Sequence, residues 1–588
     1  MFFAQKHSKI FLLILFVFFS VFTGCASGKK DEASDLTAPA VSETPITIDN
    51  TGSTKLPGTG NRKGYFGKID ESIVNDVENG DPASIKRAMS KLRKNEADYT
   101  ENEKVLISVA ASIMEIAWET EKVDWTVYAV DASNPYTGAV KSVRSGVFDS
   151  STGNSDFLST ILPCMVLFTA IKTNDKLLSQ CEASIKLALT KSPDSVLGNY
   201  LAGILYEKKG DYKTSELYLK KAYDKSSDTM QICILYSKVL STNGKNELAS
   251  KVVKSVSSSM INDIQVLKQS AYIAYQNNEL DQAEDYVARV LQQTPNDLEF
   301  VLFRAKIFIQ KKDYIHAVSL LDMYGRQNDK DLEYLLLRAK VQLDWSKNVA
   351  AATETVEKAL KLYPDSEEAL MLAAKISSMT DSPVAGKYAD ELAGTVLKKN
   401  PENTTALLYA LDGLIQRKNW SQAYDISSQL VKKASSDPEI IERHVNVCIK
   451  NGKKNEALDV AQKAYNADKN NEIILESYVY AYCQVNSRDS SLNLINSLLA
   501  STNSQHVKSF LYYQRSFLQR TEETVLADLR SSLMADSRNS DSLFRLYEIY
   551  FEKKDYKKAQ YYLKQVVAIN PNDSSLKKIN EALTQLIN

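Results

Sequence analysis

Cysteine and histidine are the residues of this sequence best suited to chemistry, and both are rare and scattered. The 588 residues include six cysteines and four histidines. His7 lies near the start of the chain, and His316, His444 and His506 fall far apart. The HExxH, CxxC and GxSxG spacings of zinc proteases, thiol pairs and serine hydrolases do not occur. The sequence therefore predicts no catalytic residue, no metal site and no cofactor.

The cysteines that follow Cys25 are interpreted as buried thiols. They number five, and an odd number completes no disulfide framework; they are Cys164, Cys181, Cys233, Cys448 and Cys483. A pairing of Cys164 with Cys181 stays open as an alternative. Acidic side chains are plentiful but recur at the spacing of a solvent-facing helix surface, as in the stretch 279–285.

The first 25 residues have the pattern of an export signal. A short basic start precedes the uncharged run 10–22, and small residues lead to Cys25. The stretch around Cys25 resembles a bacterial lipobox, with Phe22 in place of the usual leucine. This resemblance implies that residues 1–24 are removed and that Cys25 is acylated, so that the chain is secreted and held on a bacterial membrane, facing the periplasm. A plain signal peptide or an uncleaved anchor is the alternative.

Residues 25–64 are expected to form a disordered tether. They consist mainly of Ser, Thr, Gly, Pro, Ala, Lys and Asp, and large apolar side chains are nearly missing. Such a segment cannot bury enough surface to offset its ordering entropy. The run 58–64 is faintly similar to a phosphate loop, but it lacks the four-residue gap and the Ser or Thr after lysine, so we interpret it as part of the tether.

A pattern with a period of about 34 residues fills most of the remaining chain. In its clearest copy, 196–229, an apolar run with Gly203 and Tyr206 precedes a turn at Gly210, and a second run starts at Tyr212. Two apolar helical runs joined by a short turn predict a helical hairpin. Small residues recur where the two helices must touch, as at Ala283, and proline recurs before the next hairpin.

These residues match the signature positions of the tetratricopeptide repeat family, so the chain resembles a bacterial tetratricopeptide-repeat lipoprotein. The resemblance implies an all-α fold, a right-handed superhelical solenoid of about 12 hairpins. It places the repeats at 161–573 and a C-terminal capping helix at 574–588. The family's lysine, asparagine and arginine clamp for a terminal carboxylate is absent.

Residues 65–160 are expected to be helical but out of phase with the repeats. Asp81 before Pro82 is typical of a helix start, and Thr100 with Glu103 predicts a capping box. Residues 131–155 are expected to form a long loop. An enzyme site lined by Trp118, Trp125 and Tyr128 is a weaker interpretation than a helical cap packed on the first repeat.

The repeat family also implies where partners bind. Its second, fifth, ninth, twelfth and thirteenth positions face the concave surface. The predicted partner-binding residues at or beside these positions are Lys268, Tyr272, Tyr275, Tyr200, Ile204, Lys238, Leu302 and Ile309. Tyrosine beside lysine favours protein recognition, since tyrosine offers apolar area and a hydroxyl with few rotamers to freeze. The alternative is that these side chains pack between repeats or face water.

The function favoured by these observations is a lipid-anchored envelope scaffold that binds partner proteins and catalyses nothing. The balance of 72 basic against 73 acidic residues argues against a nucleic-acid partner. The expected partners are envelope proteins, and the membrane is contacted through Cys25. The alternative is a periplasmic small-ligand or substrate-delivery component of a transport system.

Overall fold

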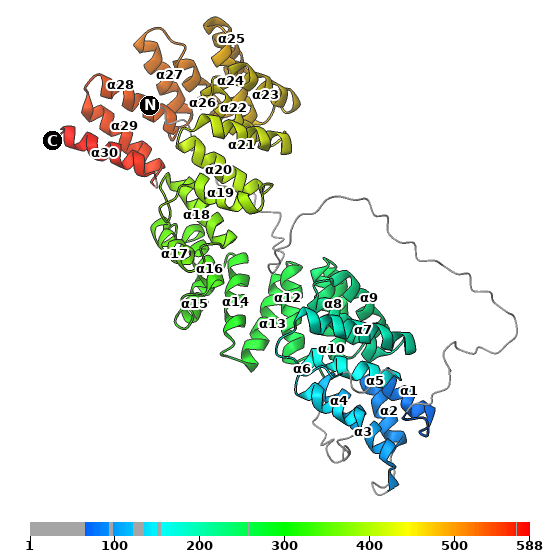
Figure 1. The fold of residues 1–588 in the computed structure, drawn as a ribbon. Coiled ribbons are helices and arrows are strands. Elements are labelled where there is room, and N and C mark those ends of the chain that lie inside the picture. Colours follow the sequence, from blue (N-terminus) through cyan, green and yellow to red (C-terminus); the bar gives the residue numbers. More distant parts are fainter. Residues whose placement is uncertain are drawn as a thin grey trace, which may run out of the picture. The chain divides into compact units, whose positions relative to one another are not determined.

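The computed structural model describes residues 65–92, 98–120, 134–149, 155–256, 258–571 and 573–587. The signal peptide, Cys25 and the tether lie outside the described residues, as do Trp125 and Tyr128. Across the described ranges the regular secondary structure is helical, which confirms the predicted all-α fold (Figure 1). The chain divides into two compact units, Gly28–Leu320 and Leu321–Asn588, and the boundary falls inside α15 (Tyr314–Gly325).

The first unit begins with helices outside the repeat pattern and continues with helical pairs. Its helices are α1 (Glu71–Asn79), α2 (Pro82–Lys91), α3 (Glu101–Ile116), α4 (Pro135–Arg144), α5 (Phe157–Ile161), the short 3₁₀ helix η3 (Leu162–Met165), α6 (Val166–Thr169), α7 (Asp175–Lys191), α8 (Val196–Lys208), α9 (Tyr212–Lys225), α10 (Met230–Thr242), α11 (Asn246–Val253), α12 (Ile264–Gln276), α13 (Leu280–Gln293) and α14 (Leu298–Gln310).

The second unit consists of further pairs and a last single helix. Its helices are α16 (Leu332–Asp344), α17 (Val349–Leu362), α18 (Glu367–Thr380), α19 (Ala389–Lys399), α20 (Thr404–Gln416), α21 (Trp420–Lys433), α22 (Pro438–Lys450), α23 (Lys454–Ala467), α24 (Glu472–Val485), α25 (Arg488–Ser501), α26 (Gln505–Ser516), α27 (Glu522–Ala535), α28 (Ser540–Glu552), α29 (Tyr556–Ile569) and α30 (Ser574–Ile587). As predicted, α30 forms the last helix, and it buries Leu576 and Leu583 against α29.

Many helix starts in the described ranges are fixed by short polar side chains that accept hydrogen bonds from free backbone N–H groups. The Asp81 carboxylate caps α2 with Pro82 at the first helical position, and Thr100 with Glu103 forms a capping box on α3. Both of these predicted caps are confirmed. In the repeats, Asp211 caps α9 by accepting from the Thr214 N–H at 3.1 Å.

Small residues let the two helices of a hairpin approach each other. A Cβ atom on Gly203 of α8 would lie 2.4 Å from the Leu219 side chain of α9, so a larger residue would require that side chain to move. Ala283 of α13 is fully buried, as expected for a residue at the contact with α12. The hairpin with extra residues is α18–α19, whose connection contains an isolated β-bridge between Val384 and Lys387.

The prediction of one long loop over 131–155 is wrong at its centre, where α4 lies. Asn134 caps this helix, accepting from the Tyr136 N–H at 3.0 Å, and Pro135 supplies the first helical residue. Residues with turn propensity here start a helix, because the apolar positions after them recur every three to four residues. Ala139 and Val143 are thereby buried in the core of the first unit.

The helices before the repeats pack onto the first full hairpin. The Ser195 hydroxyl, which caps α8, donates to the Glu78 carbonyl at 2.7 Å, and Leu197 presses against Gly80. The first repeat copy itself is irregular, since its first helix is broken into η3 and α6 before the regular α7. Every helix in the described ranges is too short or too polar to span a bilayer.

Candidate partner-binding face and a buried histidine–cysteine cluster

The first helices of successive hairpins lie side by side in the first unit, with α10 in contact with both α8 and α12. Asp263 fixes the start of α12 by accepting from the Gln265 N–H at 2.8 Å, and Asp297 fixes α14 in the same way through Phe300. Because neighbouring first helices begin at equivalent positions of the repeat, their equivalent residues lie next to one another on the same surface. We call the surface formed by α8, α10, α12 and α14 on the side of their second, fifth and ninth residues the first-helix face.

The beginning of the first-helix face is covered by the chain itself. The Tyr200 ring stacks on Trp118, with 5.1 Å between centroids and 22° between planes, and it also contacts Phe168. Tyr200 is 6% exposed and Ile204 8% exposed. Burial accordingly raises the pKa of the Tyr200 hydroxyl. Both side chains serve internal packing in this structure, which is the alternative that the sequence left open.

A short segment after α3 crosses three first helices. The Trp118 carbonyl accepts from the Gln231 side chain of α10 at 2.7 Å, and the Glu119 carboxylate accepts from the Gln265 side chain of α12 at 3.3 Å. Gln231 and Gln265 are the second residues of their helices, so they belong to the first-helix face. The Trp118 indole N–H donates in turn to the Gly80 carbonyl at 2.7 Å, which ties the segment to α1 and α2.

Lys268, Tyr272 and Tyr275 are brought together further along the face, where they connect α12 to α14. The Lys268 ammonium lies 2.7 Å from the Asp297 carboxylate and 4.8 Å from the centre of the Phe300 ring. The Tyr272 hydroxyl donates to Glu299 at 2.5 Å. The rings of Tyr272 and Tyr275 lie 4.7 and 5.3 Å from that of Phe303, and both tyrosines stay partly exposed.

The other predicted residues of the first-helix face, Leu302, Ile309 and Lys238, are not part of this aromatic group. Leu302 and Ile309 of α14 are each 5% exposed and belong to the core. The Lys238 side chain on α10 is 55% exposed and lies 2.8 Å from Glu207 of α8. The accessible part of the predicted site therefore consists mainly of Lys268, Tyr272 and Tyr275, with Lys238 at its margin.

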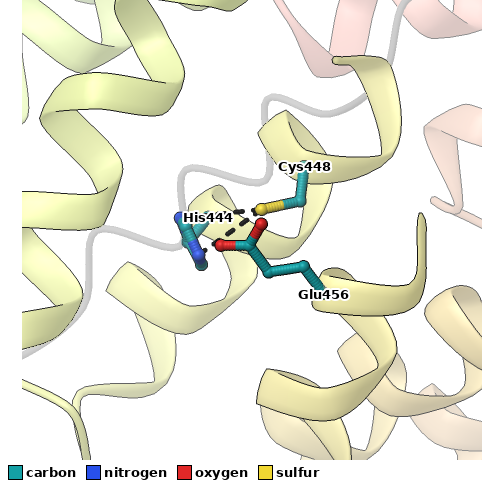
Figure 2. A group of neighbouring side chains, drawn as sticks. All are labelled: His444, Cys448 and Glu456. Carbon is teal, nitrogen blue, oxygen red and sulfur yellow. Dashed lines mark hydrogen bonds between the residues drawn. The ribbon is translucent and has the colours of Figure 1, made fainter. Parts of the chain in front are cut away.

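A second group of side chains, of types that can ligate a metal ion, lies in the second unit, and the sequence did not predict it. His444 and Cys448 on α22 approach Glu456 on α23, and their ligand atoms all lie within 4.8 Å of one another (Figure 2). Burial lowers the pKa of His444 and raises that of the Cys448 thiol to about 12. The available signal was the four-residue spacing of His444 and Cys448, which puts both on one helix face.

Two segments match the tetratricopeptide repeat family, residues 274–341 and 541–573. These two segments contain tetratricopeptide repeats. Repeats of this kind are protein-interaction modules, generally without catalytic activity of their own. No curated protein matches the chain in sequence.

Three solved structures to which the chain is similar share little sequence with it. Human IFIT1 is 14% identical with a TM-score of 0.34, over 66% of this chain and 85% of that one. The pilF protein of Pseudomonas aeruginosa is 18% identical with a TM-score of 0.29, over 34% and 90%. A tetratricopeptide repeat protein from Parabacteroides merdae is 15% identical with a TM-score of 0.25, over 49% and 98%. At these identities nothing about function follows.

Proposed function

We propose that this protein is a lipid-anchored scaffold of a bacterial cell envelope that binds partner proteins on its first-helix face and catalyses no reaction. The observation that carries the proposal is the partly exposed aromatic group of Tyr272 and Tyr275, with Lys268 beside it, at the start of the segment 274–341 that matches a protein-binding repeat family. Tyrosine rings held by neighbouring aromatics suit an interface because little rotamer entropy remains to be lost on binding.

The charges around the tyrosines define what kind of partner this surface suits. Lys268 already faces Asp297, and Tyr272 already donates to Glu299, so the surface presents paired charges beside apolar rings. A surface of this kind suits a segment that covers the rings with apolar side chains and exchanges hydrogen bonds at their edges. An extended strand or an amphipathic helix of a protein meets both requirements.

The membrane anchor is part of the proposal and is supported by the sequence alone. Cys25 follows an apolar run of signal-peptide length and small residues. Two or three acyl chains on that cysteine would hold the chain on a bilayer stably, whereas one chain gives only marginal binding. The tether 25–64 would then separate the repeats from the membrane surface, where envelope proteins are within reach.

The proposal is tested by capturing partners with the full chain from gently solubilised membranes. Replacing both tyrosines, Tyr272→Ala with Tyr275→Ala, is expected to weaken capture of the proteins that the wild type retains by about tenfold or more, because truncating a central interface residue costs about 2 kcal/mol. Tyr561→Ala is the matched control, since that tyrosine is 64% exposed on α29, outside the first unit.

The double variant also loses ring contacts with Phe303, so its folding must be measured first. Circular dichroism and the melting temperature decide whether the first unit is intact. If an intact double variant captures the same proteins as the wild type in equal amounts, the first-helix face is not the partner site. If the wild type retains no protein in stoichiometric amount, the scaffold proposal itself is wrong.

A further inference from the structure

The cluster of His444, Cys448 and Glu456 has the donor types and the spacing of a metal site. His444 and Cys448 lie one helical turn apart on α22, and Glu456 enters from the first turn of α23 (Figure 2). Imidazole nitrogen, thiolate sulfur and carboxylate oxygen are the ligands that Zn²⁺ takes in proteins. The closer ring nitrogen, Nε2 of His444, is 3.4 Å from the Cys448 sulfur.

A neighbouring hydroxyl contacts the ring nitrogen of His444 that lies farther from Cys448. The Ser427 hydroxyl on α21 lies 3.2 Å from the Tyr424 carbonyl, to which it donates its single hydrogen. Its second contact is with Nδ1 of His444, at 2.9 Å. In the tautomer that metal binding requires, the Nδ1–H of His444 donates to the Ser427 hydroxyl, and the lone pair of Nε2 is left for the ion. Metal-binding histidines are oriented in this way by a partner on the other ring nitrogen.

Glu456 is oriented by a second neighbour and has access to solvent. The Tyr424 hydroxyl donates to its carboxylate, at 2.8 Å from one oxygen and 3.1 Å from the other. The Glu456 side chain is 41% exposed, and it borders an open hollow of about 400 Å³ that Lys453 and Gln484 also line. Glu456 is therefore the member of the cluster that faces solvent, while His444 and Cys448 are buried.

We propose that His444, Cys448 and Glu456 bind one Zn²⁺ ion between α22 and α23, with a water molecule from the hollow as the fourth ligand. Tetrahedral zinc with bonds of about 2.0–2.3 Å places its ligand atoms about 3.3–3.7 Å apart. The distance of 3.4 Å between Nε2 of His444 and the Cys448 sulfur already meets this requirement. Side-chain movements of about an ångström bring a carboxylate oxygen of Glu456 within the same range of both atoms. Binding releases the thiol proton of Cys448 to solvent, so that thiolate and carboxylate together neutralise the ion.

Lys453 is the nearby cation that opposes binding. Its ammonium lies 3.8 Å from the Glu456 carboxylate and 3.5 Å from the centre of the Tyr424 ring. This side chain is 42% exposed, and a lysine on the rim of an open hollow can turn toward water at small cost. The site therefore requires Lys453 to leave Glu456, and Lys453→Met is expected to tighten zinc binding.

The test is a zinc titration of the full chain, purified without a histidine tag and stripped of metal under reducing conditions. Competition with a chromophoric chelator measures stoichiometry and affinity, and Co²⁺ in place of Zn²⁺ reports the ligands by its absorption. One ion per chain and a thiolate-to-cobalt charge-transfer band are expected. Failure of the folded wild type to bind Zn²⁺ saturably, or a cobalt spectrum without the thiolate band, overturns the proposal.

Three variants locate the ion. Cys448→Ala is expected to remove the thiolate band, and it suits the fold because alanine occupies the equivalent eleventh position of α12, at Ala274. Glu456→Gln removes a ligand charge at a partly exposed position and is expected to weaken binding by more than about tenfold. Cys233→Ala, at a buried thiol of the first unit, is the control and should bind as the wild type does.

Equal zinc affinity in the wild type and Cys448→Ala would overturn the proposal, since the ion would then lie elsewhere. Should Cys448→Ala fail to fold, Glu456→Gln decides instead. If that variant binds Zn²⁺ as tightly as the wild type, Glu456 is not a ligand and the proposal is overturned. Ser427→Ala is expected to weaken binding by about 10–100-fold, as loss of a hydrogen bond to a ligand does. These outcomes are independent of whether the first-helix face binds proteins.

Discussion

Trp118 is expected to be the residue that fastens the helices before the repeats to the first-helix face, and Trp118→Ala should release them. The side chain is 2% exposed and stacks on Tyr200. A buried tryptophan removes about 150–250 Å² from water, which is worth roughly 4–6 kcal/mol as an upper estimate. The lost indole hydrogen bond to Gly80 adds about 1 kcal/mol. Since the site partly collapses, the expected loss is about 3–5 kcal/mol.

Hydrogen exchange read by mass spectrometry measures this loss where it occurs. In Trp118→Ala, peptides from α1 to α3 and from the start of α8 should exchange faster, while peptides from the second unit keep their wild-type rates. Trp345→Ala is the control, because Trp345 is 47% exposed at the end of α16. Unchanged exchange around Tyr200 in Trp118→Ala would refute the reasoning, since it would mean that Trp118 does not hold this region.

Three further expectations concern packing, pH and the anchor. Ala283→Trp should lower the melting temperature strongly, because overpacking a filled contact costs about 1–3 kcal/mol or more; an unchanged melting curve would place Ala283 outside the contact. Hydrogen bonds from Lys186 and Lys209 lower the pKa of the Glu182 carboxyl to about 2. The stabilisation that the ionised carboxylate gives the fold is therefore present above about pH 4.5 and is lost as the pH falls toward 2. Glu182→Gln should make the free energy of unfolding depend less steeply on pH in this range. If the variant loses stability with acid as steeply as the wild type, the bonds of Glu182 to the two lysines are not the cause. Cys25→Ala should leave the chain unprocessed or free of membranes after a salt wash; full retention there would contradict acylation.

Much of the repeat region could be predicted from the sequence because each hairpin follows local rules. Ala283 and Gly203 lie at helix contacts, where their small size had suggested they belong. The caps at Asp81 and Thr100 also depend only on residues within three positions, so their chemistry is readable without a fold. The α4 helix was missed because Asn134 and Pro135 suit a turn and a helix start equally well.

The covered part of the first-helix face could not be predicted, because contacts distant in sequence leave no periodic pattern. Trp118 reaches Gln231 across 113 positions, and Glu119 reaches Gln265 across 146. Family positions alone therefore place Tyr200 on a partner-binding surface that this chain fills with its own residues. Cys448 was interpreted as a buried thiol and His444 as an isolated histidine, since only the fold brings Glu456 of the next helix to them.

Site-specific photocrosslinking on intact membranes shows whether proteins bind on the first-helix face near Tyr275. A photoreactive amino acid at position 275 would be compared with the same residue at position 561, which is exposed on α29. We expect discrete protein adducts from position 275 that disappear when Tyr272→Ala is added, and none of these adducts from position 561. Identical adducts from both positions, or none from position 275, would contradict it.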